Sequence, residues 1–302
     1  MMRNKDAFSS YHPLVNFLYF ALVLVFAMFF THPASQLISL LSALAYAVQL
    51  NGRRAMGKSL LWLLPMLLTA VVVNPAFNHE GATILAYLPT GNPLTLESIL
   101  FGLSAAMMLG AVMVWFLCYT AVMTSDKFIY LFGRIIPALS LVLSMTLRFV
   151  PKFTNQLRIV TEAQRCLGRD VSEGTVWQRT KTAITILSIL VTWALENAIE
   201  TADSMRGRGY GLPGRTAFSI YRLDSRDRTA LVWLGFCGFF ILSGWMAGGF
   251  YWRYYPTIKA AVVTPLTVMM QVCHLALCLT PVMLDRKEDR TWKQLREKMD
   301  AA

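Results

Sequence analysis

The segment 194–211 holds the residues best suited to chemistry in this sequence, and that chemistry is binding. Arg206 and Arg208 alternate with glycines at the end of a predicted helix, which glycine terminates because it adopts left-handed backbone angles at little cost. The negative end of a helix dipole favours a cation, and a guanidinium donates hydrogen bonds in a rigid fork. The segment predicts either a docking site for a partner's carboxylates and carbonyls or an ordinary helix end beside a membrane.

Small and acidic residues divide this predicted helix into two faces. Ala194, Ala198 and Ala202 recur every four residues and form a ridge that permits the close crossing of a second helix. Roughly opposite this ridge lie three acidic residues: Glu196, Glu200 and Asp203. We therefore expect one face to pack and the other to be solvated.

Two glycine-rich stretches match phosphate-binding patterns, but their surroundings argue against nucleotide binding. Residues 52–59 satisfy G-x-x-x-x-G-K-[ST], which in nucleotide hydrolases joins a buried strand to a helix. Here the stretch joins two apolar segments, so we interpret it as a basic cytoplasmic loop. Residues 209–214 satisfy G-x-G-x-x-G, but no strand precedes them and Pro213 lies where a helix would have to begin. We interpret them as a turn.

No grouping of acids, bases or nucleophiles predicts catalysis, a metal or a cofactor. The histidines lie in separate parts of the chain, and the cysteines lack the paired spacing of a disulfide framework or zinc site. The residues concerned are His12, His32, His79, His274, Cys118, Cys166, Cys237, Cys273 and Cys278. We expect a protein that is not an enzyme, with His274 as a packing residue.

The composition predicts a protein that crosses a membrane several times. Hydrophobic residues make up 56% and charged residues 15% of the 302 positions, against roughly 25% charged in ordinary soluble domains. Six apolar runs are interpreted as spans: 14–30, 33–50, 60–73, 99–123, 229–249 and 260–284. The first is long enough to remain as a span, so no cleaved signal peptide is expected. The predicted fold class is all-α: a polytopic helical membrane protein of about six spans.

Basic residues are segregated along the chain, which carries a net charge of +11. Fifteen of the 28 lysines and arginines lie in residues 125–228, and such concentrations stay on the cytoplasmic side of a membrane. We predict an N-terminal membrane domain (1–123) with four spans, a cytoplasmic domain (124–228), and a final pair of spans with a charged tail (229–302). Both termini are then cytoplasmic, and the segregation points to the lipid bilayer rather than nucleic acid.

Two apolar stretches in this cytoplasmic region, 128–150 and 183–195, are predicted not to cross the membrane. Both are flanked by basic residues, Pro137 interrupts the first, and the second is short. Between them, Pro151 is predicted to begin a helix that ends at Gly168. We expect helices at or in the inner membrane surface.

The central third of the sequence resembles the transmembrane coupling (T) component of energy-coupling factor transporters, which are vitamin and trace-metal importers of the ATP-binding-cassette class. The resemblance is carried by residues 147–151, 202–211 and 215–221. It implies two crossed cytoplasmic coupling helices between spans four and five. Each ends in an Ala-Arg-Gly signature whose arginine docks in a groove of one of two ATPase subunits.

Gly207, Arg208 and Gly209 are similar to the second signature, and Gly207 stands in place of the usual alanine. The resemblance therefore implies that Arg208 is a docking arginine and that the ridge of alanines serves the helix crossing.

The first signature departs from the family's pattern, because Cys166, Leu167 and Gly168 stand where Ala-Arg-Gly is expected. Arg165 and Arg169 lie within two residues of the missing arginine and are candidates to replace it. We hypothesise unequal attachment, in which one ATPase is held through Arg208 and the other through apolar contact around Leu167.

What the resemblance implies is a non-enzymatic scaffold in the bacterial cell membrane. It would relay ATP-driven motion of two ATPases to a small substrate-binding membrane (S) component, for which residues 128–150 offer an apolar surface. The first alternative is a self-contained permease or channel, disfavoured because the predicted spans have no Asp, Glu, Lys or Arg in their interiors. The second, a membrane-embedded enzyme, lacks any convergent catalytic groups. In this family the partner selects the substrate.

Overall fold

The structure is a computed structural model that describes residues 6–87, 92–133, 137–210, 212, 221–260 and 262–300. The chain divides into two compact units. We call Met1–Lys127 with Tyr221–Ala302 the spanning unit and Phe128–Ile220 the central unit. Each is described by itself.

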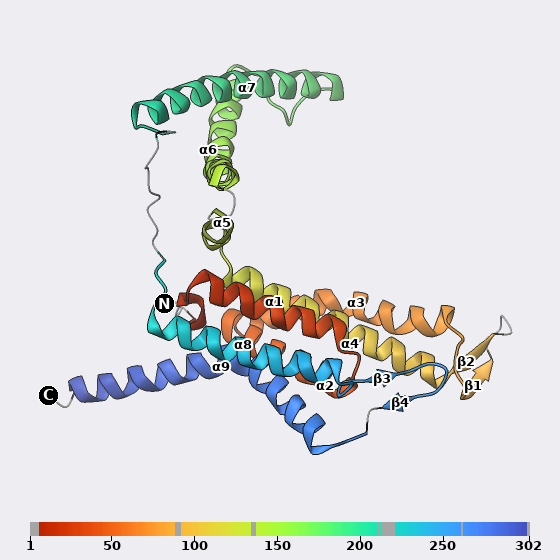
Figure 1. Ribbon diagram of the computed structural model, residues 1–302. Helices are drawn as coiled ribbons and strands as arrows, with labels where there is room; N and C mark the ends of the chain where they lie inside the picture. Colours follow the sequence, from red (N-terminus) through yellow and green to blue (C-terminus); the bar gives the residue numbers. More distant parts are fainter. Residues whose placement is uncertain are drawn as a thin grey trace. The chain divides into compact units, whose positions relative to one another are not determined.

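Helices make up nearly all of the spanning unit (Figure 1). After the short turn η1 (Phe8–Ser10), its helices are α1 (Pro13–Phe29), α2 (Pro33–Asn51), α3 (Arg53–Phe77), α4 (Leu96–Val122), α8 (Ser225–Met246) and α9 (Pro265–Asp300). Two antiparallel pairs of short strands accompany them: β1 (Ile84–Tyr87) with β2 (Pro93–Thr95), and β3 (Trp252–Arg253) with β4 (Lys259–Ala260). The predicted class, an all-α polytopic membrane protein, is confirmed.

The central unit contains α6 (Pro137–Cys166) and α7 (Val176–Gly207), and α5 (Ser125–Gly133) begins just before it. Within the central unit, α6 and α7 cross (Figure 1). The helix α7 begins with a capping box, in which Thr175 Oγ1 accepts from the Gln178 N–H and Gln178 Oε1 accepts from the Thr175 N–H.

In the part of the chain that the structure describes, five helices are long and apolar enough to cross a membrane, and α3 is a sixth if its two bent parts form one span. The five are α2, α4, α7, α8 and α9, whereas α1, predicted as the first span, has 17 residues. The helix α7 meets the same criteria although its apolar core, residues 183–195, was predicted not to cross. The helix has 32 residues and extends beyond that core at both ends, so it is longer than its apolar core alone indicates. Whether α7 crosses the membrane stays a prediction.

Two predicted boundaries are wrong. The supposed basic loop after Gly52 forms the first turns of α3, because Gly52 at φ 80° makes the whole turn by itself. Pro151 lies inside α6 rather than at its start, since a long helix tolerates the loss of one backbone hydrogen bond. The charged tail from Asp285 is helical and continues α9 to Asp300.

Two histidines begin helices. His12 and His32 each precede a proline, and their Nδ1 atoms accept hydrogen bonds from the Leu14 and Ala34 N–H groups at 3.2 Å. Proline has no backbone N–H, so it leaves no donor unsatisfied in the first turn of a helix. Each histidine with the proline after it therefore fixes where its helix starts.

The core of the spanning unit is an aromatic cluster with a polar seam beside it. Tyr19, Tyr46 and Trp115 are buried, with ring centroids 6.0 Å apart for Tyr19 and Trp115. Along α2, Ser39 accepts a hydrogen bond from Trp115 Nε1 at 3.0 Å and Gln36 accepts one from Ser104 at 2.8 Å. Such bonds hold helices together where lipid offers no hydrophobic driving force.

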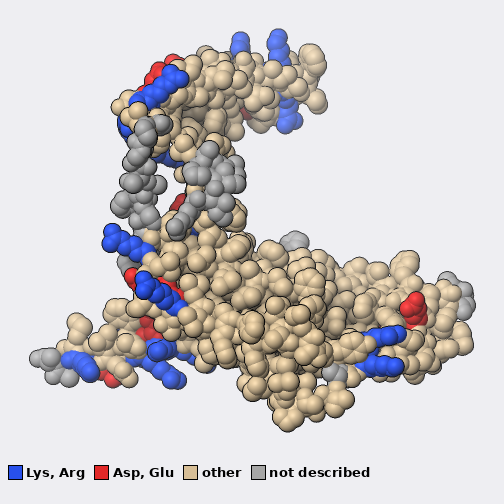
Figure 2. All heavy atoms as spheres, viewed as in Figure 1, with Lys and Arg blue, Asp and Glu red and all other residues tan. Residues whose placement is uncertain are grey.

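Charges lie at the ends of the spanning unit. On the face in Figure 2, Lys, Arg, Asp and Glu gather toward its two ends, and the surface between them is uncharged. In sequence the same is true: α2 has no charged residue, α4 has only Glu97 in its first turn, and α9 is uncharged up to Leu284. This pattern suits a bilayer.

Candidate functional site

The end of α7 is closed by a specific backbone arrangement. Gly209 has φ 73°, its N–H donates to the Arg206 carbonyl at 2.9 Å, and the Tyr210 N–H donates to the Met205 carbonyl at 3.1 Å. This is a Schellman motif, in which a left-handed glycine allows the last carbonyls of a helix to be satisfied. Arg208 is the cap residue immediately before the glycine, and its side chain is exposed.

The end of α6 has the same arrangement. Gly168 has φ 74°, its N–H donates to the Arg165 carbonyl at 3.0 Å, and the Arg169 N–H donates to the Gln164 carbonyl at 3.0 Å. The residue immediately before this glycine is Leu167, which is 70% exposed. The two helix ends therefore share one backbone geometry.

Matching the two caps bond by bond gives a register between them. Leu167 corresponds to Arg208, because each is the residue before the left-handed glycine, and Arg165 corresponds to Arg206. The sequence comparison placed Leu167 where the arginine is missing. In the structure, Leu167 and Arg208 occupy the same backbone position in their two caps. Whether these residues bind ATPases stays a prediction.

Of the two candidates to replace the missing arginine, Arg165 is engaged within its own cap. Its Nε lies 3.0 Å from Asp170 Oδ2. Hydrogen bonds from Ser172, with a smaller effect from Arg165, lower the pKa of Asp170 and keep this carboxylate charged. The ion pair directs Arg165 back toward the loop that follows α6. Arg169 contributes its backbone to the cap and has an exposed side chain.

Among the described residues, four side chains join α6 to α7 where the helices cross. The rings of Phe153 and Trp193 meet edge to face at 5.5 Å, and Lys152 Nζ lies 5.3 Å from the centre of the Trp193 ring. The same Nζ donates to Asn197 Oδ1 at 2.5 Å. An aromatic pair and a cation over a ring each contribute about 1 kcal/mol.

The ridge of alanines lies beside this contact. Ala194 is half-buried, whereas Ala198 and Ala202 are exposed. The sequence did not predict that Trp193 and Asn197 contact α6. They are four residues apart, as the alanines are, but a large ring and a polar amide do not form the ridge of small residues that indicates a close helix crossing. Use of the ridge for close approach of a helix stays a prediction.

Large apolar side chains are exposed along α7. They recur at helical spacing and form what we call the α7 stripe: Ile184, Leu187, Val191, Leu195 and Ile199. Leu187 and Leu195 are 60% and 62% exposed. An apolar surface of this extent marks contact with another protein or with lipid.

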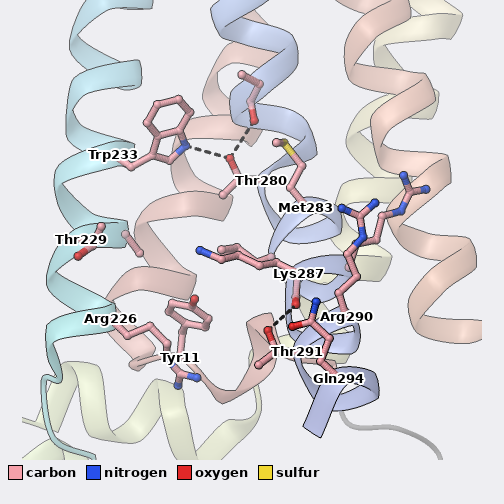
Figure 3. A pocket seen from close by; sticks show the side chains of 14 residues that line it. Tyr11, Arg226, Thr229, Trp233, Thr280, Met283, Lys287, Arg290, Thr291 and Gln294 are labelled. Atoms are coloured by element: carbon pink, nitrogen blue, oxygen red, sulfur yellow. Dashed lines mark hydrogen bonds between the residues drawn. The ribbon is translucent and has the colours of Figure 1, made fainter. Parts of the chain in front are cut away.

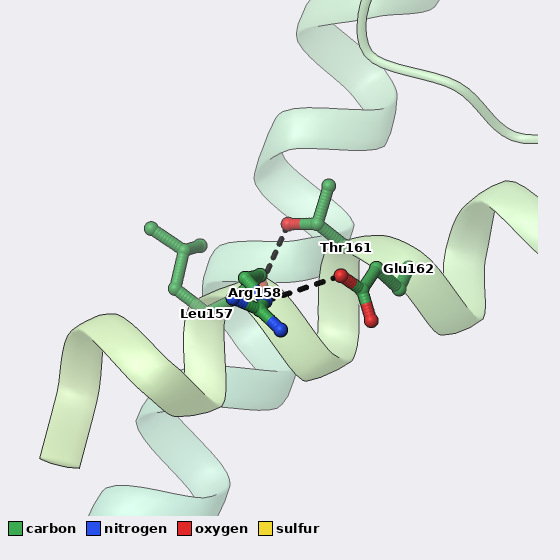
Figure 4. Close-up of polar contacts among 4 residues, drawn as sticks. All are labelled: Leu157, Arg158, Thr161 and Glu162. Atoms are coloured by element: carbon green, nitrogen blue, oxygen red, sulfur yellow. Dashed lines mark hydrogen bonds and ion pairs between the residues drawn. The ribbon is translucent and has the colours of Figure 1, made fainter.

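The outer face of α6 satisfies its polar groups within the helix. Arg158 Nε lies 3.2 Å from Glu162 Oε1, and Thr161 donates to the Leu157 carbonyl at 2.7 Å (Figure 4). Both contacts join residues four apart, and exposed pairs of this kind contribute little stability. The charges of Arg158 and Glu162 are therefore paired within α6.

Comparison with known proteins places the chain in a family. The model of the CbiQ family, described as a cobalt transport protein, matches residues 8–218. The chain belongs to this family. The match covers α1 to α7, so it includes both capped helix ends.

Curated relatives of this chain are named energy-coupling factor transporter transmembrane protein EcfT. The protein from Lacticaseibacillus paracasei is 36% identical over 107 residues, which are 35% of this chain and 39% of the relative. The protein from Bacillus selenitireducens is 36% identical over 112 residues, or 36% of this chain and 42% of the relative. The chain thus matches about two fifths of the length of these relatives. The resemblance to T components of energy-coupling factor transporters is confirmed, and the chain is a membrane protein of the transporter class.

Parts of the resemblance lie outside the described residues. Gly211 and residues 213–220 are among them, which includes most of the stretch 215–221 and of the turn 209–214. Residues 147–151 lie within α6.

Proposed function

We propose that this chain is the coupling subunit of an energy-coupling factor importer in a bacterial cell membrane. It binds two ATP-binding-cassette ATPases at the ends of α6 and α7 and relays their ATP-driven motion to a separate substrate-binding membrane component. It has no catalytic activity of its own, and both of its termini face the cytoplasm. The cargo, a vitamin or a trace metal, is selected by the substrate-binding partner.

One observation carries this proposal: two helices cross within one unit, and each ends in the same glycine-closed cap that exposes the residue before the glycine. A backbone geometry that occurs twice suits two partners of one kind. A crossing at which Phe153 and Lys152 contact Trp193 suits the transfer of force from one helix to the other.

The charges and the apolar stripe support separate parts of the proposal. Arg208 at the negative end of the α7 dipole suits a carboxylate-lined groove on an ATPase. The α7 stripe suits a hydrophobic membrane partner, which approaches closely where Ala198 and Ala202 leave the backbone accessible.

A self-contained permease or channel is the alternative, and no observation favours it. Carriers driven by protons or voltage use ionisable side chains inside their spans. In the part of the chain that the structure describes, α2 has no charged residue, α4 and α8 have theirs in the first turn, and α9 has none before Asp285. His274, buried in α9, packs against the ring of Phe30 with centroids 5.6 Å apart, as a packing residue does.

The test is co-purification of the tagged full chain from its native membrane in mild detergent. The unmodified chain is expected to bring two ATPases and one small hydrophobic protein. Arg208→Glu should weaken at least one ATPase contact by about 2–5 kcal/mol, because it replaces a charge-assisted contact by repulsion. Lys181→Glu, an equal charge change on an exposed residue at the other end of α7, is the control. A chain that purifies alone and transports unaided would overturn the proposal.

A further inference from the structure

A groove of about 950 Å³ lies between α8 and α9 on the spanning unit (Figure 3). Its two halves differ in chemistry. One half is apolar, with Trp233, Ala276, Met283 and Leu284 among its lining. The other half is cationic, with Arg226, Arg286, Lys287 and Arg290. None of the described residues that line the groove is acidic.

The boundary between the halves coincides with the end of the apolar spans. On α9 the uncharged stretch ends at Leu284, and the charged stretch begins at Asp285. On α8, Arg226 and Arg228 precede the apolar turns that contain Trp233. The groove therefore lies where hydrocarbon gives way to lipid headgroups and water.

Charged residues of α9 line two different hollows. Arg286, Lys287 and Arg290 line the groove, whereas the acidic residues among them line a different hollow: Asp285, Glu288 and Asp289. Asp285 is engaged on that side, where its Oδ1 accepts from the Ala7 N–H at 2.6 Å. Every charged residue that α9 contributes to the lining of the groove is therefore a cation.

The groove is also fixed in position at both ends. The Arg226 guanidinium lies over the Tyr11 ring, 4.3 Å from its centre, and its Nη2 donates to Ser10 Oγ at 3.3 Å. This uses one N–H of five and leaves others for a ligand. At the apolar end, Trp233 Nε1 donates to Thr280 Oγ1 at 3.2 Å, so the indole has no polar atom left to satisfy (Figure 3).

We propose that this groove binds an anionic glycerophospholipid. Its phosphate lies among Arg226, Arg286, Lys287 and Arg290, and an acyl chain lies along Trp233 and Ala276. Charge complementarity selects the anionic headgroup, and the apolar half selects a lipid over a soluble phosphate, which would leave that half in water. A zwitterionic lipid brings its own cation into a cationic site and binds more weakly.

Native mass spectrometry of the full chain tests this proposal. The chain is exchanged into nanodiscs of phosphatidylglycerol or phosphatidylcholine and released in detergent, and the retained lipid is counted. One phosphatidylglycerol per chain should survive release, and phosphatidylcholine should not. The triple variant Arg286→Gln, Lys287→Gln, Arg290→Gln should retain at least about tenfold less phosphatidylglycerol, since each basic residue near an anionic membrane surface strengthens attraction severalfold.

The matched control removes three cations from the same helix off the groove: Lys293→Gln, Arg296→Gln and Lys298→Gln. It should retain phosphatidylglycerol as the unmodified chain does. An equal loss of phosphatidylglycerol in both triple variants would mean that the total positive charge of α9, and not the groove, retains the lipid. That result would overturn the proposed site.

Two further arms distinguish a lipid from a free phosphate. Ala276→Phe narrows the apolar half, and it should reduce lipid retention while leaving all four cations in place. Excess glycerol 3-phosphate should not displace the lipid. Displacement by this soluble headgroup, or full retention in Ala276→Phe, would show that the apolar half does not contribute and would overturn the lipid assignment.

Discussion

The spanning unit and the central unit differ in how much of themselves they bury. In the spanning unit, fully buried side chains such as Trp115, Tyr19 and Tyr46 form a continuous core. In the described part of the central unit only Val160, Gln164 and Ile186 are buried, although many large apolar side chains of α6 and α7 are exposed. A helix pair of that kind gains little stability from its own contacts, so surroundings outside it must supply the rest.

This difference shows that the structures of the two units are stabilised in different ways. The spanning unit specifies its structure internally, through aromatic packing and the polar seam on α2. The central unit specifies only a crossing and two capped ends, and it leaves apolar surface to be covered by lipid or by a partner. Four predictions break or sharpen this comparison.

The largest effect is expected from a matched pair of tryptophans. Trp115→Ala removes a fully buried ring and its bond to Ser39, so it should lower the free energy of unfolding by about 3–5 kcal/mol. Trp193→Ala removes a half-buried ring from the central unit and should lower the free energy of unfolding far less. Thermal unfolding in detergent measures both. Equal losses would mean that the central unit is as tightly packed as the spanning unit.

The next effect concerns the α7 stripe. Leu187→Asn with Val191→Asn should weaken binding of the small membrane partner by about 3 kcal/mol, because two apolar side chains lose their burial on binding. The ATPases should still co-purify, since the cap at Arg208 is unchanged.

The control for the stripe is Thr192→Asn, an exposed polar position on the same helix. Quantitative co-purification reads out both partners. Unchanged recovery of the small protein in the double variant would show that the stripe faces lipid alone.

A smaller effect separates the two capped ends. If Leu167 makes apolar contact with an ATPase, Leu167→Arg should weaken that contact by about 2 kcal/mol. Arg165→Ala should have less effect, because Arg165 is paired with Asp170. Titration of each purified ATPase against the detergent-solubilised chain measures the affinities. If both variants leave assembly and uptake unchanged, the hypothesis of unequal attachment fails.

The smallest effect is expected from the protonation of Asp6, which lies in the spanning unit. Burial is the main cause that raises the pKa of Asp6 from 3.8 to about 6, although Tyr46 donates to its carboxylate at 2.7 Å. The folded state thus holds this proton more tightly than the unfolded state, and stability falls as pH rises from about 4 to about 6.

Asp6→Asn stays neutral at every pH. It should therefore stabilise the chain by about 1–2 kcal/mol at a pH of about 8 and by almost nothing at a pH of about 4. Thermal unfolding at the two pH values measures the difference. An equal gain at both values would mean that the carboxyl does not titrate in the folded state.

The pattern of apolar runs was enough to predict most of the spanning helices. Pro33 and Gly52 bound α2 within a residue of the predicted run, because proline and glycine restrict the backbone locally. Glycine also placed the ends of α6 and α7 correctly, at Gly168 and Gly209. These features depend on neighbouring residues only, and a sequence contains that information in full.

Pro151 shows where local reasoning fails. Proline favours a helix start, yet in α6 the helix continues through it, because contacts beyond the adjacent turns decide whether a missing hydrogen bond is tolerated. The serines of α2 are similar: nothing in the sequence says that Ser39 meets Trp115, 76 positions away.

The sequence by itself determined the membrane class, the segregation of charge and the arginine-tipped end of α7, because composition and short-range backbone preference suffice for these. The local backbone then closes the ends of α6 and α7 with one cap geometry, in which Leu167 and Arg208 have equivalent positions. Only the tertiary structure decided which residues far apart in the chain meet. It decided that Trp193 and Asn197 contact α6 and that the cations of α9 line a groove with α8. These features join residues far apart in the chain, and their formation depends on how the helices pack.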